Sequence, residues 1–361
     1  MIRSGIRVLG LMSGTSLDGL DICLARFIDE ENHWNYEIEF AETISYSSEW
    51  LKKLIHAEKT SSNGQAGNEL MKLHEEYGNY LGECVSSFLK KNKTTKPLFV
   101  ASHGHTIFHQ PARSVGEIGY TFQLGLGSAI KNACGIPVVS DFRTLDVSLG
   151  GQGAPLVPIG DALLFGQYEY CLNLGGFANI SFDENGKRIA YDICAVNYVL
   201  NRLAKRLGKN YDVDGTLSAS GKIIPEILEK LNAFPHFKKS PPKSIGREWV
   251  EEFIFPLLSE NEKTEDLLRT FTEHAVGQIS KAISGSGKVF VTGGGAHNLF
   301  FIGQLKEKCN AEISIPDSKT VDFKEALIFG FLGLLRWNGQ INTLASVTGA
   351  SRDSSGGEIF K

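Results

Sequence analysis

Apolar residues near the N-terminus form two short runs, Ile6–Met12 and Leu20–Phe27, separated by turn-forming residues. Two such runs joined by Gly, Ser and Asp are typical of a β-hairpin. Glu37–Tyr46 alternates between apolar and polar residues, as a third strand would. Apolar residues then recur at helical spacing through Gln65–Asn92, which predicts an amphipathic helix. Short buried strands are expected further along, at Leu98–Ser102 and Val138–Ser140.

The second half of the chain repeats this order of elements. Three more strands are expected, at Tyr170–Leu174, Ala178–Phe182 and Lys187–Ile193. A helix follows at Val196–Leu207, and a later strand, Lys288–Thr292, leads into a helix from about Asn298. A further apolar helix is expected at Phe323–Trp337. The pattern predicts two α/β lobes of similar strand order.

Length and charge narrow the class of protein. The chain has 361 residues, which at about 100–200 residues per domain predicts two domains. We expect residues 1–138 with 338–361 to form an N-terminal lobe and residues 139–337 a C-terminal lobe. The balance of 37 basic and 41 acidic residues gives a net charge of −4, which argues against a nucleic-acid partner.

The apolar runs and the cysteines indicate the compartment. The longest apolar run, Leu327–Leu335, is much shorter than a bilayer span, and no apolar leader precedes Ser13. The six cysteines contain no CxxC pair and are typical of thiols in a reducing compartment. We therefore expect no membrane contact and a cytoplasmic location.

Glycine is enriched, at 39 of 361 residues, and is concentrated at the ends of predicted strands. Three glycine-rich turns stand out, at Ser13–Gly19, Gly175–Asn179 and Gly293–Asn298. Turns of this kind expose backbone N–H groups, which bind phosphate oxygens. One such turn is common in proteins, but three at matching positions of a repeated pattern predict a nucleotide site.

The other phosphate-binding motifs do not match. Gly125-Leu126-Gly127 begins a dinucleotide fingerprint, but its third glycine position holds Ile130. Gly287-Lys288 resembles the end of a P-loop, but the earlier glycine is Ala282 and the following hydroxyl position is Val289. The signatures of protein kinases and of serine hydrolases are absent. A duplicated lobe of actin or hexokinase type satisfies the pattern best.

Three histidines, His103, His105 and His109, lie close together in the sequence. No carboxylate or cysteine completes a zinc-binding set with them, and a histidine beside a glycine at a strand end often bonds to backbone. We expect structural roles for them and no directly bound metal.

Eight sequence blocks carry a family resemblance. GLMSGTSLDGLD, at Gly10–Asp21, resembles the signature of the anhydro-N-acetylmuramic acid kinases, members of the sugar kinase, heat-shock-70 and actin superfamily. Seven similar blocks follow in order: SHGHTIFHQP, SDFRTLDVSLGGQGAPLVP, LNLGGFANIS, PKSIGRE, VTGGGAHN, FKEAL and SVTGA. Each block is weak alone, but eight in order along the whole chain are specific.

The resemblance implies an α/β fold of two ribonuclease-H-like lobes, of actin or hexokinase type, around a nucleotide cleft. It also implies an enzyme that converts ATP, water and 1,6-anhydro-N-acetylmuramic acid to N-acetylmuramic acid 6-phosphate, with Mg²⁺ on the nucleotide phosphates. This reaction belongs to the recycling of cell-wall amino sugars. Family precedent further implies a homodimer.

Asp192 matches the family's catalytic aspartate, which deprotonates the water that attacks C1. The residues alone equally allow Asp192 to cap the following helix. The nucleotide-binding residues that the resemblance implies are Gly14, Thr15, Ser16, Leu17, Asp18, Gly19, Leu20, Asp21, Gly175, Gly176, Asn179, Gly293, Gly294, Gly295 and Asn298. Asp18 either orients Mg²⁺ through water or closes its own turn.

The sugar-binding residues that the resemblance implies are Thr106, Arg143, Asn197 and Glu325. The Arg143 guanidinium suits a carboxylate or a phosphate. The alternative is that Arg143 and Glu325 form only a salt bridge between two elements.

The chain departs from the family pattern at three places. After Asp192 it reads Ile193-Cys194-Ala195-Val196-Asn197, without the usual Gly-Pro-Gly turn, so we expect this loop to follow another path. His105 stands where glutamine is usual, and Gln123–Gly127 lacks a common polar residue. Two other functions therefore stay open: a kinase for another 1,6-anhydro sugar such as levoglucosan, or a catalytically silent ATP-binding regulator.

Overall fold

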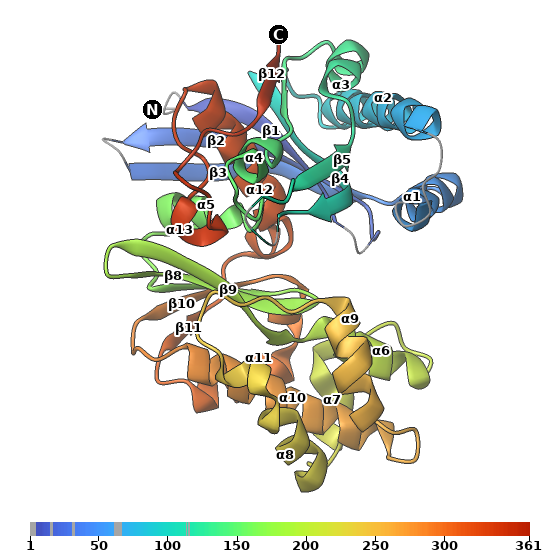
Figure 1. Ribbon diagram of the computed structural model, residues 1–361, viewed down its shortest axis with the longest axis vertical. Helices are drawn as coiled ribbons and strands as arrows, with labels where there is room; N and C mark the ends of the chain where they lie inside the picture. The colour runs from blue at the N-terminus through green and yellow to red at the C-terminus, as the bar shows by residue number, and fades with distance from the viewer. Residues whose placement is uncertain (1–4, 15–16, 31–32, 61–66, 113, 115) are drawn as a thin grey trace. The chain divides into compact units, whose positions relative to one another are not determined.

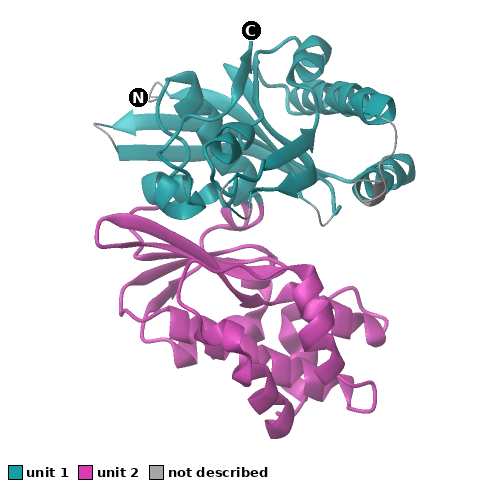
Figure 2. Ribbon diagram, in the orientation of Figure 1, with its two compact units in different colours: residues 1–164, 323–361 teal, residues 165–322 magenta. Residues whose placement is uncertain are grey.

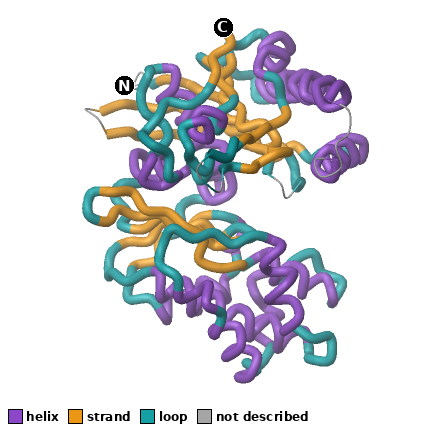
Figure 3. Tube along the Cα trace, in the orientation of Figure 1, coloured by secondary structure: helices purple, strands orange, loops and turns teal. Residues whose placement is uncertain are grey.

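The computed structural model divides into two compact units, each described by itself (Figures 1 and 2). It describes every residue except 1–4, 15–16, 31–32, 61–66, 113 and 115. The first unit comprises residues 1–164 and 323–361, and the second comprises residues 165–322. Each unit contains one β-sheet and several helices (Figure 3).

The first unit is built on a mixed sheet with the strand order β12-β6-β4-β1-β2-β3, and β5 pairs with β4 outside this path. Its strands are β1 (Ile6–Ser13), β2 (Leu20–Glu30), β3 (His33–Ile44), β4 (Phe99–Gln110), β5 (Tyr120–Leu124), β6 (Val138–Ser140) and β12 (Glu358–Phe360). The pairs β1–β2 and β2–β3 are antiparallel, whereas β1–β4 and β4–β6 are parallel.

Helices cover both faces of this sheet. The α-helices of this unit are α1 (Ser48–Thr60), α2 (Gly67–Lys91), α3 (Gly127–Cys134), α4 (Thr144–Ser148), α5 (Val157–Leu164), α13 (Ala345–Thr348) and, from residue 323 onward, α12 (Ser318–Trp337). On one face, Leu9 and Leu11 of β1 share an apolar core with Tyr77 of α2. On the other face α12 approaches so closely that a Cβ at Gly10 would overlap the Ala326 carbonyl. Gly10 is therefore required for the packing of α12.

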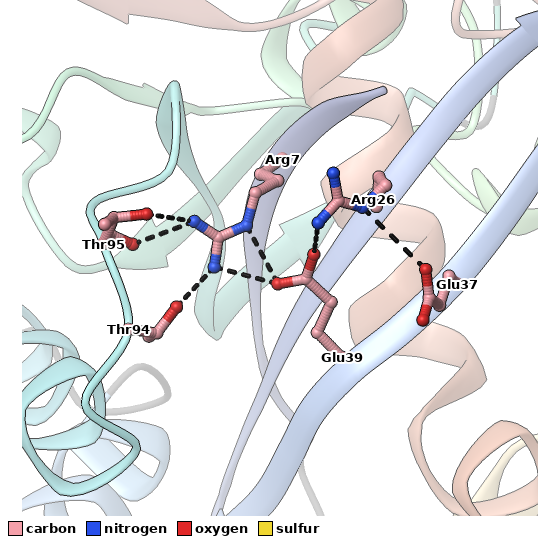
Figure 4. Close-up of polar contacts among 6 residues, drawn as sticks. All are labelled: Arg7, Arg26, Glu37, Glu39, Thr94 and Thr95. Atoms are coloured by element: carbon pink, nitrogen blue, oxygen red, sulfur yellow. Dashed lines mark hydrogen bonds and ion pairs between the residues drawn. The ribbon is translucent and has the colours of Figure 1, made fainter. Parts of the chain in front are cut away.

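Charged side chains fix the register of the first three strands (Figure 4). Arg7 of β1 and Arg26 of β2 both bond to Glu39 of β3. Arg7 also donates to the hydroxyls of Thr94 and Thr95, which precede β4. This network ties three strands and the α2–β4 connection together.

The second unit has the strand order β11-β10-β7-β8-β9. Its strands are β7 (Tyr170–Leu174), β8 (Phe177–Glu184), β9 (Lys187–Ala195), β10 (Lys288–Thr292) and β11 (Glu312–Ser314). Its α-helices are α6 (Asn197–Arg206), α7 (Thr216–Ser220), α8 (Pro225–Ala233), α9 (Arg247–Trp249), α10 (Thr264–Ala282) and α11 (Leu299–Lys308). Leu172 and Leu174 of β7 share the core of this unit with Phe271 and Ala275 of α10.

The two sheets have the same topology. In each, three consecutive antiparallel strands form one side, and the first of them pairs in parallel with the fourth strand of the motif, which pairs in parallel with a fifth. The order 3-2-1-4-5 is thus β3-β2-β1-β4-β6 in one unit and β9-β8-β7-β10-β11 in the other. This repetition confirms the predicted pair of ribonuclease-H-like α/β lobes.

The units are divided at other positions than the sequence led us to expect. We expected boundaries after residues 138 and 337, whereas the compact units change after Leu164 and before Phe323. The reason is pairing: β6 forms ladders with β4 and β12, so residues 138–140 belong to the first sheet. Among the described residues, no helix combines the length and the apolar character that a bilayer span needs.

Candidate active site

Polar side chains form a row across the sheet of the second unit. In register, Thr292 of β10 lies beside Asn173 of β7, Asn173 beside Asn179 of β8, and Asn179 beside Asp192 of β9. Residues directly opposite one another in a sheet present their side chains to the same face. The row therefore places a hydroxyl, two amides and a carboxylate on one face, opposite the face on which Leu172 and Leu174 join the core.

Three members of this row have no side-chain hydrogen bond with any residue that the structure describes. The Thr292 hydroxyl is buried and has no hydrogen-bond partner in the described part of the chain. The amides of Asn173 and Asn179, both partly buried, form no side-chain hydrogen bond with the described residues. Buried polar groups are nearly always satisfied in proteins, so the Thr292 hydroxyl indicates a place for a polar ligand, and the two partly exposed amides beside it are available to the same ligand.

Asp192 ends the row and is partly buried. Its Oδ2 accepts one hydrogen bond, from the Ile245 backbone N–H at 3.2 Å, and its own N–H donates to the Lys243 carbonyl at 3.2 Å. Burial raises the pKa of the Asp192 carboxyl, and the Ile245 bond opposes that rise. A carboxylate with a raised pKa is a better proton acceptor than an ordinary aspartate.

The structure rules out the helix cap as the role of Asp192. Helix α6 begins at Asn197, and its N-cap position is Val196. A bulge in β9 at Ile193 displaces the pairing, since Ala178 faces Cys194 while Asn179 faces Asp192. Asp192 therefore lies within a strand.

The segment that lacks the expected Gly-Pro-Gly turn belongs to the core. Cys194 and Val196 are 0% exposed, and β9 continues through Ala195. None of the three residues adopts a left-handed conformation, so their side chains cause no strain of that kind. Where the family pattern has a Gly-Pro-Gly turn, this chain therefore has the end of β9 followed by Val196, and all three residues are buried in the core.

Two glycine turns of the second unit, Gly175–Gly176 and Gly293–Gly295, lie beside Leu174 at the end of β7. The carbonyl of Gly175 accepts from the Asn197 N–H, and that of Gly176 accepts from the N–H groups of Val196 and Tyr198. The Asn197 side-chain amide donates to the Leu174 carbonyl at 3.1 Å. Asn197, which the resemblance implied for sugar binding, thus lies at the glycine turns of the second unit.

The glycines of the two turns differ in what the fold requires of them. Gly293 has φ +83°, and a Cβ on Gly295 would lie 2.8 Å from the Leu174 Cβ. At Gly175 and Gly176 the nearest atoms to an added Cβ lie at 3.5 and 3.8 Å, and neither has a left-handed φ. Packing and conformation explain Gly293 and Gly295, but they do not explain Gly175 and Gly176.

Asn298 has a structural role of its own. It is the N-cap of α11, and its Oδ1 accepts from the Phe301 N–H at 2.9 Å. Gly294 precedes it in the same turn and has no atom closer than 3.9 Å to an added Cβ.

The first unit contains the third glycine turn, between β1 and β2. The Leu17 N–H donates to the Gly14 carbonyl at 3.2 Å, and Leu17 has φ +61°. Such a conformation is unfavourable for leucine, and strained backbone of this kind is enriched at functional sites. Thr15 and Ser16, both expected to bind nucleotide, lie outside the described residues.

The remaining residues of this turn are well placed in the strands. Asp18 is exposed, and Gly19 and Leu20 are buried at the start of β2. The Asp21 carboxylate accepts from the Thr43 hydroxyl at 2.6 Å, so it already supports the β2–β3 pair. Among the described residues Asp18 forms no side-chain hydrogen bond that would close its own turn.

Arg143 is held by neighbours in the first unit. It donates to His103 Nε2 from Nε at 3.1 Å and from Nη2 at 2.8 Å, and to the Gly153 carbonyl from Nη1 at 2.6 Å. Burial lowers the pKa of Arg143 to about 10, which leaves it charged at neutral pH. His103 is neutral, because burial lowers its pKa well below the ordinary value.

Glu325 of α12 lies near this arginine without a direct contact. Burial raises the pKa of Glu325, and the charges of Lys324 and Arg143 oppose the rise. No ion pair among the described residues joins Arg143 to Glu325, so the simple salt bridge between them is not formed. Thr106 lies on β4, in register with Gln123 of β5, and is partly exposed.

Comparison with known proteins identifies the family. The family model described as anhydro-N-acetylmuramic acid kinase matches residues 6–361. This chain belongs to the anhydro-N-acetylmuramic acid kinase family. It is therefore a kinase, and the resemblance found in the eight blocks is confirmed.

Two relatives show how far the similarity extends. The anhydro-N-acetylmuramic acid kinase of Nitrosospira multiformis is 33% identical over 378 residues, with 98% of each chain covered. That of Colwellia psychrerythraea is 31% identical over 399 residues and covers 99% of this chain and 98% of its own. Component A of the (R)-2-hydroxyglutaryl-CoA dehydratase of Acidaminococcus fermentans aligns with a TM-score of 0.45 and 15% identity, covering 89% of this chain and 95% of its own.

Within this anhydro-N-acetylmuramic acid kinase family member, sequence reasoning missed Asn173 and Thr292. Both stand inside blocks that carry the resemblance: Asn173 lies two residues before Gly175 in LNLGGFANIS, and Thr292 lies directly before Gly293 in VTGGGAHN. Their signal is a polar residue at or next to the end of an otherwise apolar strand. Among the described residues, no three His, Cys, Asp or Glu side chains gather as a metal site would require.

Proposed function

We propose that the chain converts ATP, water and 1,6-anhydro-N-acetylmuramic acid to ADP and N-acetylmuramic acid 6-phosphate. The observation that carries this proposal is Asp192, a carboxylate with a raised pKa and one backbone hydrogen bond, at the end of a polar row beside two glycine turns. A binding protein without turnover has no need of such a base.

The proposed reaction couples opening of the anhydro ring to transfer of the γ-phosphoryl group. Asp192 takes a proton from a water molecule, whose oxygen forms a bond to C1 while the C1–O6 bond breaks. O6 then forms a bond to the γ-phosphorus of ATP, and the bond from that phosphorus to the ADP oxygen breaks. The proton on Asp192 is released to solvent before the next turnover.

The proposed nucleotide contacts come from three turns. The β1–β2 turn, Gly14–Asp21, and the β7–β8 turn, with Gly175, Gly176 and Asn179, present backbone N–H groups to phosphate oxygens. The turn with Gly293, Gly294, Gly295 and Asn298 lies on the adenosine side. Mg²⁺ arrives on the nucleotide, and the exposed Asp18 is the proposed contact for its water shell.

The proposed sugar contacts are Thr106, Arg143 and Glu325. Because Arg143 already holds His103 and Gly153, only its remaining N–H groups are available to a lactyl carboxylate. The raised pKa of Glu325 suits a group that shares hydrogen bonds with sugar hydroxyls. We assign Asn197 to the turns of the second unit instead.

The experiment that tests the function follows oxygen from water. The chain is incubated with ATP, Mg²⁺ and 1,6-anhydro-N-acetylmuramic acid in ¹⁸O-labelled water, and early products are analysed by mass spectrometry. We expect one ¹⁸O at C1 and none in the phosphate ester. Authentic N-acetylmuramic acid 6-phosphate in the same water measures spontaneous exchange at C1, and extrapolation to zero time removes it.

Other outcomes identify other functions. Turnover of levoglucosan in preference to the muramic acid sugar would replace the substrate but keep the reaction. ATP binding without turnover of either sugar would contradict the proposed activity. The proposal places the reaction in the cytoplasm, where ATP is supplied, within the recycling of cell-wall amino sugars; size-exclusion chromatography tests the expected homodimer.

A further inference from the structure

The two neighbouring histidines of β4 point to opposite faces of the first sheet. His103 packs against Phe329 of α12, whereas His105 packs against Tyr77 of α2. In a regular strand, residues two positions apart share a face. Gly104, with φ +73°, is the extra residue of a bulge, since Leu11 pairs with Ser102 while Ser13 pairs with His105.

The bulge brings His105 to the end of β1. Its Nδ1 lies 2.8 Å from the Ser13 hydroxyl, and its Nε2 lies 3.2 Å from Glu58 Oε1 of α1. The side chain of His105 is fully buried, and that of Glu58 is 31% exposed. His105 therefore connects the last residue of β1 to a helix.

Two tyrosines extend this chain of hydrogen bonds. The Ser13 hydroxyl lies 2.7 Å from the Tyr46 hydroxyl, which lies 2.7 Å from the Tyr77 hydroxyl. Burial raises the pKa of Tyr46 and, more strongly, that of Tyr77, so both phenols keep their protons. Four buried side chains and Glu58 thus form one connected network.

The donors and acceptors of this network fit a single direction when the imidazole is neutral. Because the Glu58 carboxylate can only accept, His105 Nε2 carries the proton and Nδ1 accepts from Ser13. Ser13 then accepts from Tyr46, and Tyr46 accepts from Tyr77. Every hydroxyl proton is used, which fixes the Ser13 side chain in one orientation.

We propose that His105 is a positioning residue for the phosphate-binding turn, acting through Ser13. Ser13 directly precedes Gly14, and the network holds this end of β1 before nucleotide arrives. The inference rests on the proposed function, because it assumes that residues 14–21 contact the phosphates of ATP. Holding Ser13 in place in advance removes part of the entropy loss that binding would otherwise require.

The test measures nucleotide affinity and sugar kinetics separately. Ser13→Ala, His105→Ala and the double variant are titrated with MgATP by calorimetry, and kcat and both KM values are measured. We expect each single variant to weaken ATP binding by about 3- to 10-fold, as for the loss of about one ordered side chain. The double variant should be no weaker than the weaker single variant, because both act through one network. The KM for the sugar should stay unchanged.

Three further variants keep the test decisive. His56→Ala, an exposed histidine of the same helix as Glu58, is the matched control and should bind ATP like the wild type. Tyr46→Phe removes only the hydroxyl that bonds to Ser13, and with Ser13→Ala it decides the matter if His105→Ala does not fold. His105→Asn keeps an amide that can reach Ser13 and should recover part of the affinity.

Each outcome has one meaning. Unchanged ATP affinity in Ser13→Ala and Tyr46→Phe, or additive losses in the double variant, would overturn the inference and leave the proposed function intact. A fall in kcat together with equal rises in the KM for ATP and the KM for the sugar would show a merely structural role and would also overturn the inference. If the wild-type chain itself binds no ATP, the proposed function fails and the inference fails with it.

Discussion

The polar residues of the two sheets are satisfied to different degrees. In the first unit Arg143 donates to His103 and Gly153, and Asp146 accepts from the Gly153 N–H and the Thr348 hydroxyl. In the second unit Thr292 has no partner among the described residues, and Asp192 accepts a single backbone bond. The hydrogen-bond acceptors around Arg143 thus have their donors within the first unit, whereas the Thr292 hydroxyl of the second unit has no partner among the described residues. Substitution of Arg143 should therefore reduce stability, whereas substitution of a residue in the row from Thr292 to Asp192 should reduce activity with little change in stability.

The largest effect should come from Asp192→Asn. The amide cannot accept a proton from water, so we expect kcat to fall by about 10²- to 10⁴-fold, the usual contribution of a general base. The Asn side chain can still accept from the Ile245 N–H, so folding and the affinity for ATP should be kept. Steady-state kinetics, calorimetry with MgATP and circular dichroism check this expectation. Activity near the wild-type level would exclude Asp192 as the base.

The next largest effect should come from the loss of Arg143 in the first unit. Arg143→Ala leaves His103 Nε2 and the Gly153 carbonyl without their donor, at about 1–3 kcal/mol for each unsatisfied group. We expect a loss of about 2–4 kcal/mol in the free energy of unfolding, measured by urea denaturation.

Asn179→Ala is the matched comparison in the second unit. It breaks no hydrogen bond to a described residue, so its stability should change by about 1 kcal/mol or less while activity falls. If Asn179→Ala lost much stability and Arg143→Ala lost little, the difference in unfolding free energy between the two variants would be the opposite of the one expected.

Gly295 and Gly176 of the second unit should respond differently to substitution by alanine. Gly295→Ala places a Cβ 2.8 Å from the Leu174 Cβ, and we expect about 1–3 kcal/mol of destabilisation from overpacking. Gly176→Ala meets no atom closer than 3.8 Å, so the fold should accept it. If phosphate approaches this turn, Gly176→Ala should instead weaken ATP binding by about 10-fold, as for the loss of about 1.4 kcal/mol. Thermal melts with and without MgATP separate the two effects, and unchanged ATP affinity in Gly176→Ala would remove this turn from the site.

Much of this arrangement could be predicted from the sequence, because strand runs and glycine turns are local signals. The strands at residues 6–12, 20–27, 170–174 and 288–292 agree with β1, β2, β7 and β10. The bulges at Gly104 and Ile193 could not be predicted, since they depend on pairing with strands distant in the chain. For the same reason the row from Thr292 to Asp192, which joins four strands, became visible only in the sheet.

The smallest effect should be a difference between the wild type and Asp192→Asn in how stability depends on pH. Burial raises the pKa of Asp192 in the folded chain above its value in the unfolded chain, so ionisation is less favourable in the folded state. Below the unfolded pKa, at about 3.9, both states are protonated and the residue contributes nothing. As the pH rises past that value the wild type loses stability, and the loss is complete above the folded pKa.

Asp192→Asn carries no charge at position 192 at any pH. Its melting temperature should therefore be equal to or higher than that of the wild type at pH 7, and the two melting temperatures should converge in acid. A variant less stable than the wild type at pH 7 would show that the carboxylate is stabilised by a partner, and a base held by such a partner would be a poor acceptor for the proton of water.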